Sequence, residues 1–259
     1  MQKTLLILIL SVFSLNSFAQ NKKKDRQEQK KAQINEMVRM EEEGVITHRK
    51  STVFGLKLTT DGYGAFFEVG RASSVKKALL FQLDISERKH PKEEKLSSLY
   101  SQSIPFVYGK INNFYPVKLG VQQQILFGNK SNKNGVSVTG NVGGGLSLAL
   151  LRPYYVQINT GNDLKYVKYN SPDSLDFLGG AIFGGPTLSK GWNEMTVTPG
   201  VYGKAALRFD YGIFNDIVSA LEVGVNAEYY SKKIPQMVYN DEKKFFYGAY
   251  FSLIFGKRK

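Results

Sequence analysis

Cysteine is absent from this chain of 259 residues. Its absence excludes a lipidated N-terminal cysteine, a disulfide framework and any metal site with cysteine ligands. Histidine is almost as scarce, because the chain has only His48 and His90. Beyond the N-terminus the sequence has no apolar run long enough for a membrane-spanning helix. A membrane could therefore be crossed only by strands closed into a barrel, which satisfies every backbone polar group in lipid.

The first 19 residues predict a cleavable signal peptide. Lys3 supplies the positive start, and an apolar core runs from Leu5 to Phe13. This core is too short for a spanning helix, and the small residues Ser17 and Ala19 precede the expected cut before Gln20. The mature chain is therefore expected to be exported.

Residues 20–50 predict a charged periplasmic extension. The segment is rich in Lys, Arg, Gln and Glu and has few aromatic residues. Its one apolar group could share a side of a helix and comprises Ile34, Met37, Val38 and Met40. Two interpretations stay open: a disordered leader, or a short helix that docks a periplasmic protein or a cell-wall partner.

Strict alternation of apolar and polar residues dominates the rest of the chain. It is clearest in two segments, residues 201–211 and 217–230. The apolar side of the second segment comprises Leu221, Val223, Val225, Ala227 and Tyr229, and the polar side comprises Glu222, Asn226 and Glu228. Successive side chains of a strand point to opposite faces, so lipid on one side and a polar lumen on the other would fit this pattern.

Residues 51–259 are accordingly predicted to form an all-β, up-and-down antiparallel transmembrane β-barrel. Nine alternating segments are readable, and bacterial single-chain barrels have an even number of strands. We expect the missing strand within residues 152–194, where residues 154–158 and 164–169 are candidates for a spanning strand or for a pair outside the membrane. The prediction is ten strands, with eight as the alternative, and with 152–194 as a long, mobile extracellular loop.

Alternation places five basic and five acidic side chains inside the barrel. The predicted lumen charge network comprises Lys57, Glu68, Asp84, Arg88, Lys118, Lys204, Arg208, Asp210, Glu222 and Glu228. A barrel of eight to ten strands has room for little more than its own side chains, so balanced charges should pair and close the lumen. The alternative is a narrow polar pore, although an open pore would more naturally carry an excess of one sign.

The formal net charge is +13. An exported barrel first meets anionic lipid and phosphorylated glycolipid, so these, and not nucleic acid, are the expected partners. Catalysis has little support, because alternation puts Ser86 and Glu87 on opposite faces beside His90, and His90 with Glu93 or Glu94 gives too few metal ligands. We expect no enzyme, metal or cofactor.

Several segments resemble a family of outer-membrane β-barrel proteins from Bacteroidota, described as porin-like or OmpA-like barrels. They are His90–Glu93, Tyr108–Asn113, Gly144–Leu148 with Arg152–Tyr155, Lys190–Glu194 and the ending Leu253–Arg258. The resemblance extends from about Thr52 to the C-terminus. It implies an outer-membrane barrel without an assigned reaction, and the broader group includes barrels that accompany secretion machinery.

The function expected from the sequence is an envelope scaffold or accessory protein, including a secretion-associated role, built on a closed barrel. Three alternatives remain: a narrow porin-like channel for small polar solutes, a barrel enzyme that modifies envelope lipids, and a soluble secreted barrel. The last would need polar side chains where Leu221, Val223 and Val225 are predicted to face outward.

Overall fold

The computed structural model describes residues 28–29, 32, 36, 49–97, 104–129, 135–159, 163–170, 174–179, 181–212 and 217–259. The signal peptide predicted for residues 1–19 lies outside this part of the chain. So does most of the extension at 20–50. Its described residues are Glu28, Gln29, Ala32 and Glu36, which are helical, and Arg49 and Lys50, the second of which begins the first strand. No helix in the described ranges combines the length and apolar character needed to cross a membrane.

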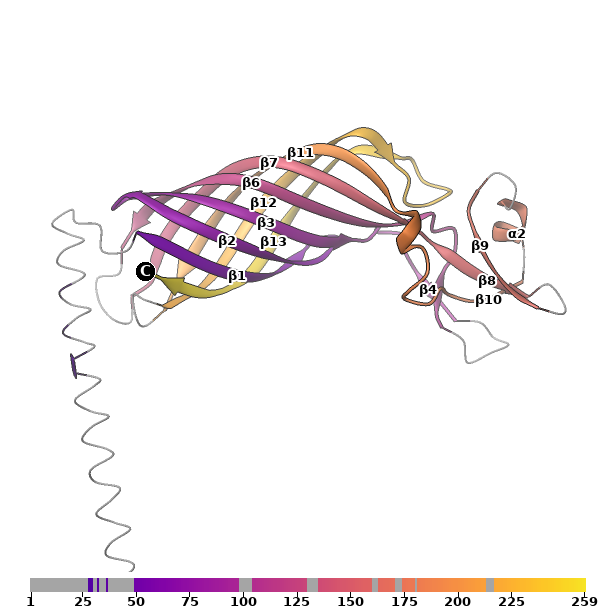
Figure 1. Ribbon diagram of the computed structural model, residues 1–259, viewed down its shortest axis with the longest axis horizontal. Helices are drawn as coiled ribbons and strands as arrows, with labels where there is room; N and C mark the ends of the chain where they lie inside the picture. The colour runs from indigo at the N-terminus through magenta and orange to yellow at the C-terminus, as the bar shows by residue number, and fades with distance from the viewer. Residues whose placement is uncertain are drawn as a thin grey trace, which may run out of the picture.

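Eight antiparallel strands close into a barrel (Figure 1). They are β1 (Lys50–Thr59), β2 (Gly62–Ser74), β3 (Lys77–Arg88), β6 (Asn112–Gly128), β7 (Ser137–Pro153), β11 (Thr196–Asp210), β12 (Ile217–Ile234) and β13 (Lys243–Arg258). Each strand pairs with the next along the chain, and β1 pairs with β13 to close the ring. The all-β, up-and-down architecture predicted from alternation is therefore confirmed, with eight strands.

The preferred count of ten strands was wrong, because three alternating segments lie outside the barrel. The segment after Phe106 contributes only β5 (Phe106–Val107), which pairs with β4 (Lys95–Leu96). The two candidates for a hidden span form β8 (Tyr155–Asn159) and β9 (Leu164–Lys168). These two strands pair with each other, and β8 also pairs with β10 (Ile182–Gly184).

The two ends of the barrel differ. At the terminal end lie the start of β1, the end of β13 and the connections β2–β3, β6–β7 and β11–β12. At the opposite end, besides the β1–β2 turn, three connections emerge, between β3 and β6, β7 and β11, and β12 and β13, and the first two are the longest of the barrel. We call the described residues of these connections, within 89–111, 154–195 and 235–242, the cap; Figure 1 shows it beyond one end of the barrel.

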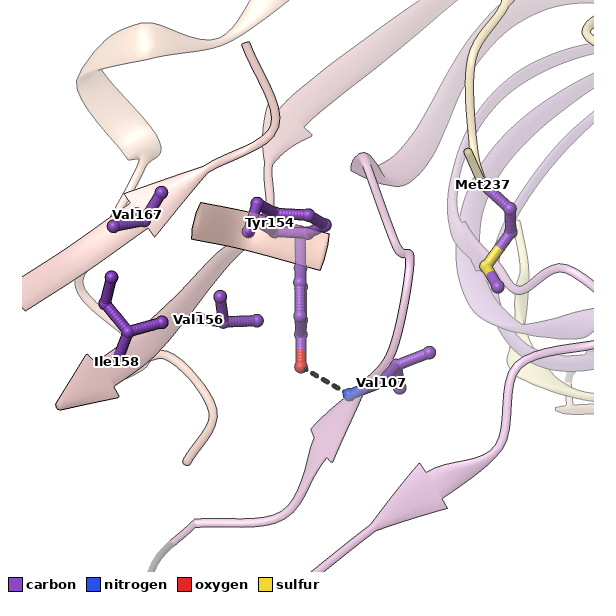
Figure 2. Close-up of a cluster of buried hydrophobic side chains, with 7 residues drawn as sticks. Val107, Tyr154, Val156, Ile158, Val167 and Met237 are labelled. Atoms are coloured by element: carbon purple, nitrogen blue, oxygen red, sulfur yellow. Dashed lines mark hydrogen bonds between the residues drawn. The ribbon is translucent and has the colours of Figure 1, made fainter. Parts of the chain in front are cut away.

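The cap has its own apolar core (Figure 2). It draws on all three connections and comprises Val107, Tyr154, Val156, Ile158, Val167, Phe177 and Met237. The Tyr154 hydroxyl accepts a hydrogen bond from the Val107 amide at 3.0 Å, which ties the first connection to the second. Residues 152–194 were predicted to be a long mobile loop, but their described part contains β8, β9, β10, the helix α2 (Ser174–Gly179) and the 3-10 turn η1 (Trp192–Glu194).

The outer wall of the barrel is apolar. Exposed positions include Phe54, Leu56, Phe67, Phe81, Leu83, Leu119, Leu146, Val201, Leu207, Val223, Val225, Phe251 and Phe255. They alternate along each strand with the buried, mostly polar positions of the lumen. An apolar surface that surrounds the whole barrel is the reverse of a soluble protein, whose large apolar side chains lie inside.

Candidate functional site: the barrel lumen

All ten residues of the lumen charge network are buried, and each contacts a residue of opposite charge. Strand alternation on β1, β2, β3, β6, β11 and β12 turns them inward. Lys57 on β1 pairs with Asp84 on β3. Because β2 lies between these two strands in the ring, the pair joins strands that are not hydrogen-bonded to each other. Buried charges are tolerated when they are paired and hydrogen-bonded, and the ten fall into a few connected groups.

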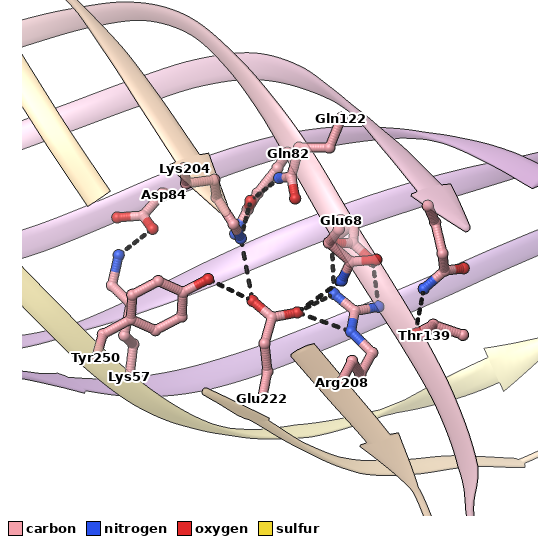
Figure 3. Close-up of polar contacts among 12 residues, drawn as sticks. Lys57, Glu68, Gln82, Asp84, Gln122, Thr139, Lys204, Arg208, Glu222 and Tyr250 are labelled. Carbon is pink, nitrogen blue, oxygen red and sulfur yellow. Dashed lines mark hydrogen bonds and ion pairs between the residues drawn. The ribbon is translucent and has the colours of Figure 1, made fainter. Parts of the chain in front are cut away.

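Glu222 is the centre of the largest group (Figure 3). Its carboxylate accepts hydrogen bonds from Arg208 Nε at 2.8 Å, Lys204 Nζ at 3.0 Å and the Tyr250 hydroxyl at 2.7 Å. Asn141 Nδ2 adds a fourth donor at 2.9 Å. Four donors from β7, β11 and β13 thus converge on one carboxylate that has no solvent exposure.

Arg208 extends this group to β2. Its two terminal nitrogens donate in parallel to the two oxygens of Glu68, at 2.8 and 2.9 Å. A guanidinium matches a carboxylate in this bidentate geometry, which fixes the direction of both side chains. Lys204 in turn donates to Gln82 at 3.0 Å, and Gln82 accepts from Gln122. The Arg208–Glu222 group therefore spans the lumen.

Glu228 is the centre of a second group, nearer the cap. Lys118 Nζ lies 2.6 Å from its carboxylate, and Arg88 approaches it at 3.3 Å. Arg88 also pairs with Asp61 at 2.5 Å. The Tyr230 hydroxyl donates to Glu228 at 2.7 Å. At the terminal end, Asp210 pairs with Arg258 at 2.5 Å.

Apolar clusters close the lumen on either side of the charged groups. Toward the terminal end the cluster comprises Val53, Phe66, Val218, Ala220 and Ile254. Toward the cap it comprises Phe114, Ala149, Leu151, Tyr230 and Ile234, with Phe246 packed against them. The sequence analysis predicted a polar lumen and did not identify these inward apolar residues.

Two inward glycines make room for large rings. A Cβ atom on Gly55 would lie 2.3 Å from the Phe66 ring, and one on Gly120 would lie 2.4 Å from the Tyr202 hydroxyl. Neither contact is sterically allowed, so a side chain at either position would displace the ring. The glycines on β1 and β6 thus allow aromatic side chains to fill the cross-section of a narrow barrel.

Sequence reasoning missed several partners of the network. Tyr250 lies inward on the last strand, where only the outward residues were considered. Asp61 is in the β1–β2 turn, so alternation within strands could not identify it. Arg258 is the last residue of β13 and shares the inward parity of Tyr250. Tyr250 had a usable signal, since it alternates with the outward residues Ala249 and Phe251.

His90, the residue considered for catalysis, lies in a turn after β3. Its amide donates to Glu93 Oε1 at 2.9 Å, and its Nδ1 accepts from the Lys92 amide at 3.2 Å. Glu93 in turn pairs with Lys110 at 2.6 Å. These contacts hold a turn together, and they involve no serine. In the described ranges, no cluster of three or more His, Cys, Asp or Glu side chains could hold a metal ion.

Comparison with known proteins returns matches to solved structures only: no protein-family model and no curated protein matches this chain. One match is the N-terminal β-barrel domain of Pseudomonas aeruginosa OprF, at 10% identity, 82% of this chain, 98% of that chain and a TM-score of 0.35. Another is Neisserial surface protein A, at 12% identity over 80% of this chain and 95% of that chain, with a TM-score of 0.37. A third is Ail, the attachment invasion locus protein of Yersinia pestis, at 11% identity over 82% of this chain and 100% of that chain, with a TM-score of 0.36.

Proposed function

We propose that this chain is an integral outer-membrane β-barrel with a sealed lumen, which acts as a scaffold that displays the folded cap outside the cell. The closure of the lumen is the observation that carries the proposal. Ion pairs around Glu222 and Glu228 cross the barrel, and an apolar cluster lies toward each end. Such an interior gives a solute no continuous polar path.

The outer wall supports the membrane location. Its aliphatic and aromatic side chains are exposed all round the barrel, and a closed barrel leaves no strand edge unpaired in lipid. The direction of insertion follows from the two ends. Outer-membrane barrels place both termini and short turns in the periplasm and long connections outside. The cap belongs by this rule to the cell surface.

Display of the cap is testable because the chain has no cysteine of its own. Leu175→Cys introduces a thiol on exposed α2 of the cap, and Lys76→Cys introduces one in the exposed β2–β3 turn at the opposite end. In intact cells that produce the full chain, a membrane-impermeant maleimide should label Leu175→Cys only. Lys76→Cys should react after the outer membrane is permeabilised. Labelling of Lys76→Cys alone in intact cells would contradict the proposed direction of insertion.

The expected partner of residues 20–50 stays part of the same proposal. In the proposed direction of insertion this basic extension lies in the periplasm, where a protein or the cell wall could bind it. Deletion of residues 21–43 should leave the barrel assembled, as judged by heat-modifiable migration on a gel, and should release proteins that co-purify with the full chain. An unchanged set of co-purifying proteins would count against a docking role.

A further inference from the structure

On two neighbouring strands, the row of aliphatic residues on the outer wall ends near the cap and is followed by an aromatic or a basic residue. The aliphatic positions are Val117, Leu119 and Val121 on β6, and Leu146, Leu148 and Leu150 on β7. The next residue in each row is Tyr115 on β6, which is half-buried, and Arg152 on β7, which is buried against the Trp192 ring. Tyr115 pairs in register with Leu150, the residue two before Arg152, so Tyr115 and Arg152 lie at nearly the same height along the barrel axis. This height marks the cap-side border of the apolar wall.

The chain between β10 and β11 lies against this border. The Trp192 ring stacks on Tyr115, with centroids 5.9 Å apart and an interplanar angle of 15°. The Arg152 guanidinium lies 4.7 Å from the Trp192 ring and 5.6 Å from the Tyr115 ring. Trp192 Nε1 donates to the Leu188 carbonyl at 2.7 Å, and Arg152 Nη1 donates to the same oxygen at 3.2 Å. Residues 188–192 are thus fixed on the outside of the barrel.

Two large apolar side chains of this segment are not covered by the cap. Leu188 is 88% exposed and Trp192 is 49% exposed, although Trp192 is fixed by its ring contacts and its hydrogen bond. An ordered, exposed leucine beside an exposed tryptophan is unfavourable in water. It is favourable at a membrane interface, where tryptophan rings concentrate.

Basic groups surround the same place. The Lys190 ammonium lies 5.5 Å from the Tyr155 ring and 5.4 Å from the Tyr166 ring. Glu194, an acid of the same segment, already accepts hydrogen bonds from Lys168 and from the Tyr155 hydroxyl. These two bonds hold the pKa of Glu194 below its usual range. The charge of Glu194 is thus partnered by Lys168. Glu87 on β3, which acts on Tyr115 from the wall, accepts a hydrogen bond from the Tyr63 hydroxyl at 2.5 Å. Buried Arg152 and exposed Lys190 supply positive charge at the border.

We infer that residues 188–192 with Tyr115 and Arg152, here called the rim patch, form a membrane-interface anchor that binds a lipid phosphate. Leu188 and Trp192 enter the boundary between head groups and acyl chains, and exposed Lys190 contacts the phosphate of an outer-leaflet lipid. The inference rests on the proposed membrane location. The patch continues the lipid-facing wall, and its charge complements a phosphate, so a lipid fits it better than a protein partner does.

Trp192 is the only tryptophan of the chain, so its fluorescence reports on the rim patch alone. The refolded full chain is inserted into vesicles whose lipids carry a quencher near the head group, at mid-chain or at the chain end. Insertion is established first, by flotation with the vesicles and by heat-modifiable migration. The quencher near the head group should reduce Trp192 emission most, and aqueous iodide should reduce it little.

The phosphate is tested in vesicles of galactosyl diacylglycerol, which has no phosphate, with phosphatidylglycerol added in steps. Trp192 emission should change with the phosphatidylglycerol fraction. Lys190→Gln should weaken this response about fivefold, as expected for one lysine at an anionic surface. Lys92→Gln, a matched change at an exposed lysine on another connection of the cap, should leave it unchanged.

The outcomes separate this inference from the proposed function. A chain that fails to float or to show heat-modifiable migration would overturn the membrane location itself. An inserted barrel whose Trp192 is quenched by iodide and not by lipid quenchers would overturn only the rim patch. Protection from both quenchers would indicate a protein or a second copy on the patch and would also overturn it. A response to inorganic phosphate that equals the response to the lipid would overturn the lipid as ligand.

Discussion

Arg208 and Glu222 are direct cross-strand partners in the register of β11 and β12, and their side chains meet inside the barrel at 2.7 Å. Arg208 also binds Glu68 on β2, so a single guanidinium joins two strands that are not neighbours in the ring. Because neither carboxylate reaches solvent, these contacts both stabilise the barrel and occupy its cross-section.

Glu222→Gln should destabilise the barrel. The change keeps the shape of the side chain but leaves Lys204 without its carboxylate and Arg208 with only Glu68. Breaking a buried ion pair in this way costs about 3–5 kcal/mol. Urea unfolding in lipid vesicles, followed by heat-modifiable migration, would measure the loss. Glu242→Gln, the same change at an exposed position, is the control, and equal stability of the two variants would contradict the account.

The lipid-facing wall predicts a depth-dependent cost of charge. Val225 and Val197 are almost equally exposed, at 58% and 57%, but Val225 lies mid-strand on β12 and Val197 lies at the cap end of β11. Val225→Lys should cost about 2–4 kcal/mol in a bilayer and Val197→Lys about 0–1 kcal/mol. Folding titrations in vesicles would compare them. Equal effects would indicate that the wall does not face lipid.

The cap core predicts a local effect on stability. Phe177 on α2 is fully buried, whereas Leu175 on the same helix is 83% exposed. Phe177→Ala should cost about 3–5 kcal/mol of cap stability through the cavity it leaves. Leu175→Ala should be nearly neutral. Hydrogen exchange followed by mass spectrometry should reveal faster exchange in β8 and β9 for Phe177→Ala, with β12 unchanged. Faster exchange throughout the barrel would contradict a separate cap core.

His90 predicts a pH dependence at the mouth of the barrel. Burial lowers the pKa of its imidazole below the usual value of 6.5. The unfolded chain therefore takes up a proton at a higher pH than the folded turn does. The stability that depends on neutral His90 is present above about pH 6.5 and is lost as the pH falls below it. NMR titration of the His90 ring should give a pKa below 6.5, and a value at or above 6.5 would be contrary to the prediction.

Alternation explains why much of the architecture was predictable. Residues such as Val223 and Glu222 must face opposite sides of a strand, so the sequence separates wall from lumen residue by residue. The number of strands was harder, because β8 alternates as a spanning strand does but ends after five residues. Only its pairing with β9 and β10 places it in the cap, and pairing between distant segments is not encoded in one segment's period.

The interior was predictable for charge and not for shape. Phe66 and Ile254 face the lumen although they are apolar, and Phe66 fits because Gly55 faces its ring from the neighbouring strand. Such a fit depends on two residues that are distant in the chain. The role of Asp61 as a partner of Arg88 depends likewise on the turn that brings it to the end of β3.

The central claim is that the lumen is sealed, and single-channel recording in planar bilayers tests it most directly. The refolded full chain, with insertion established by heat-modifiable migration, should produce no discrete current steps at either polarity. Steady channels whose conductance rises with salt and shifts in Arg208→Gln would contradict a sealed lumen, and the chain would then be a narrow pore.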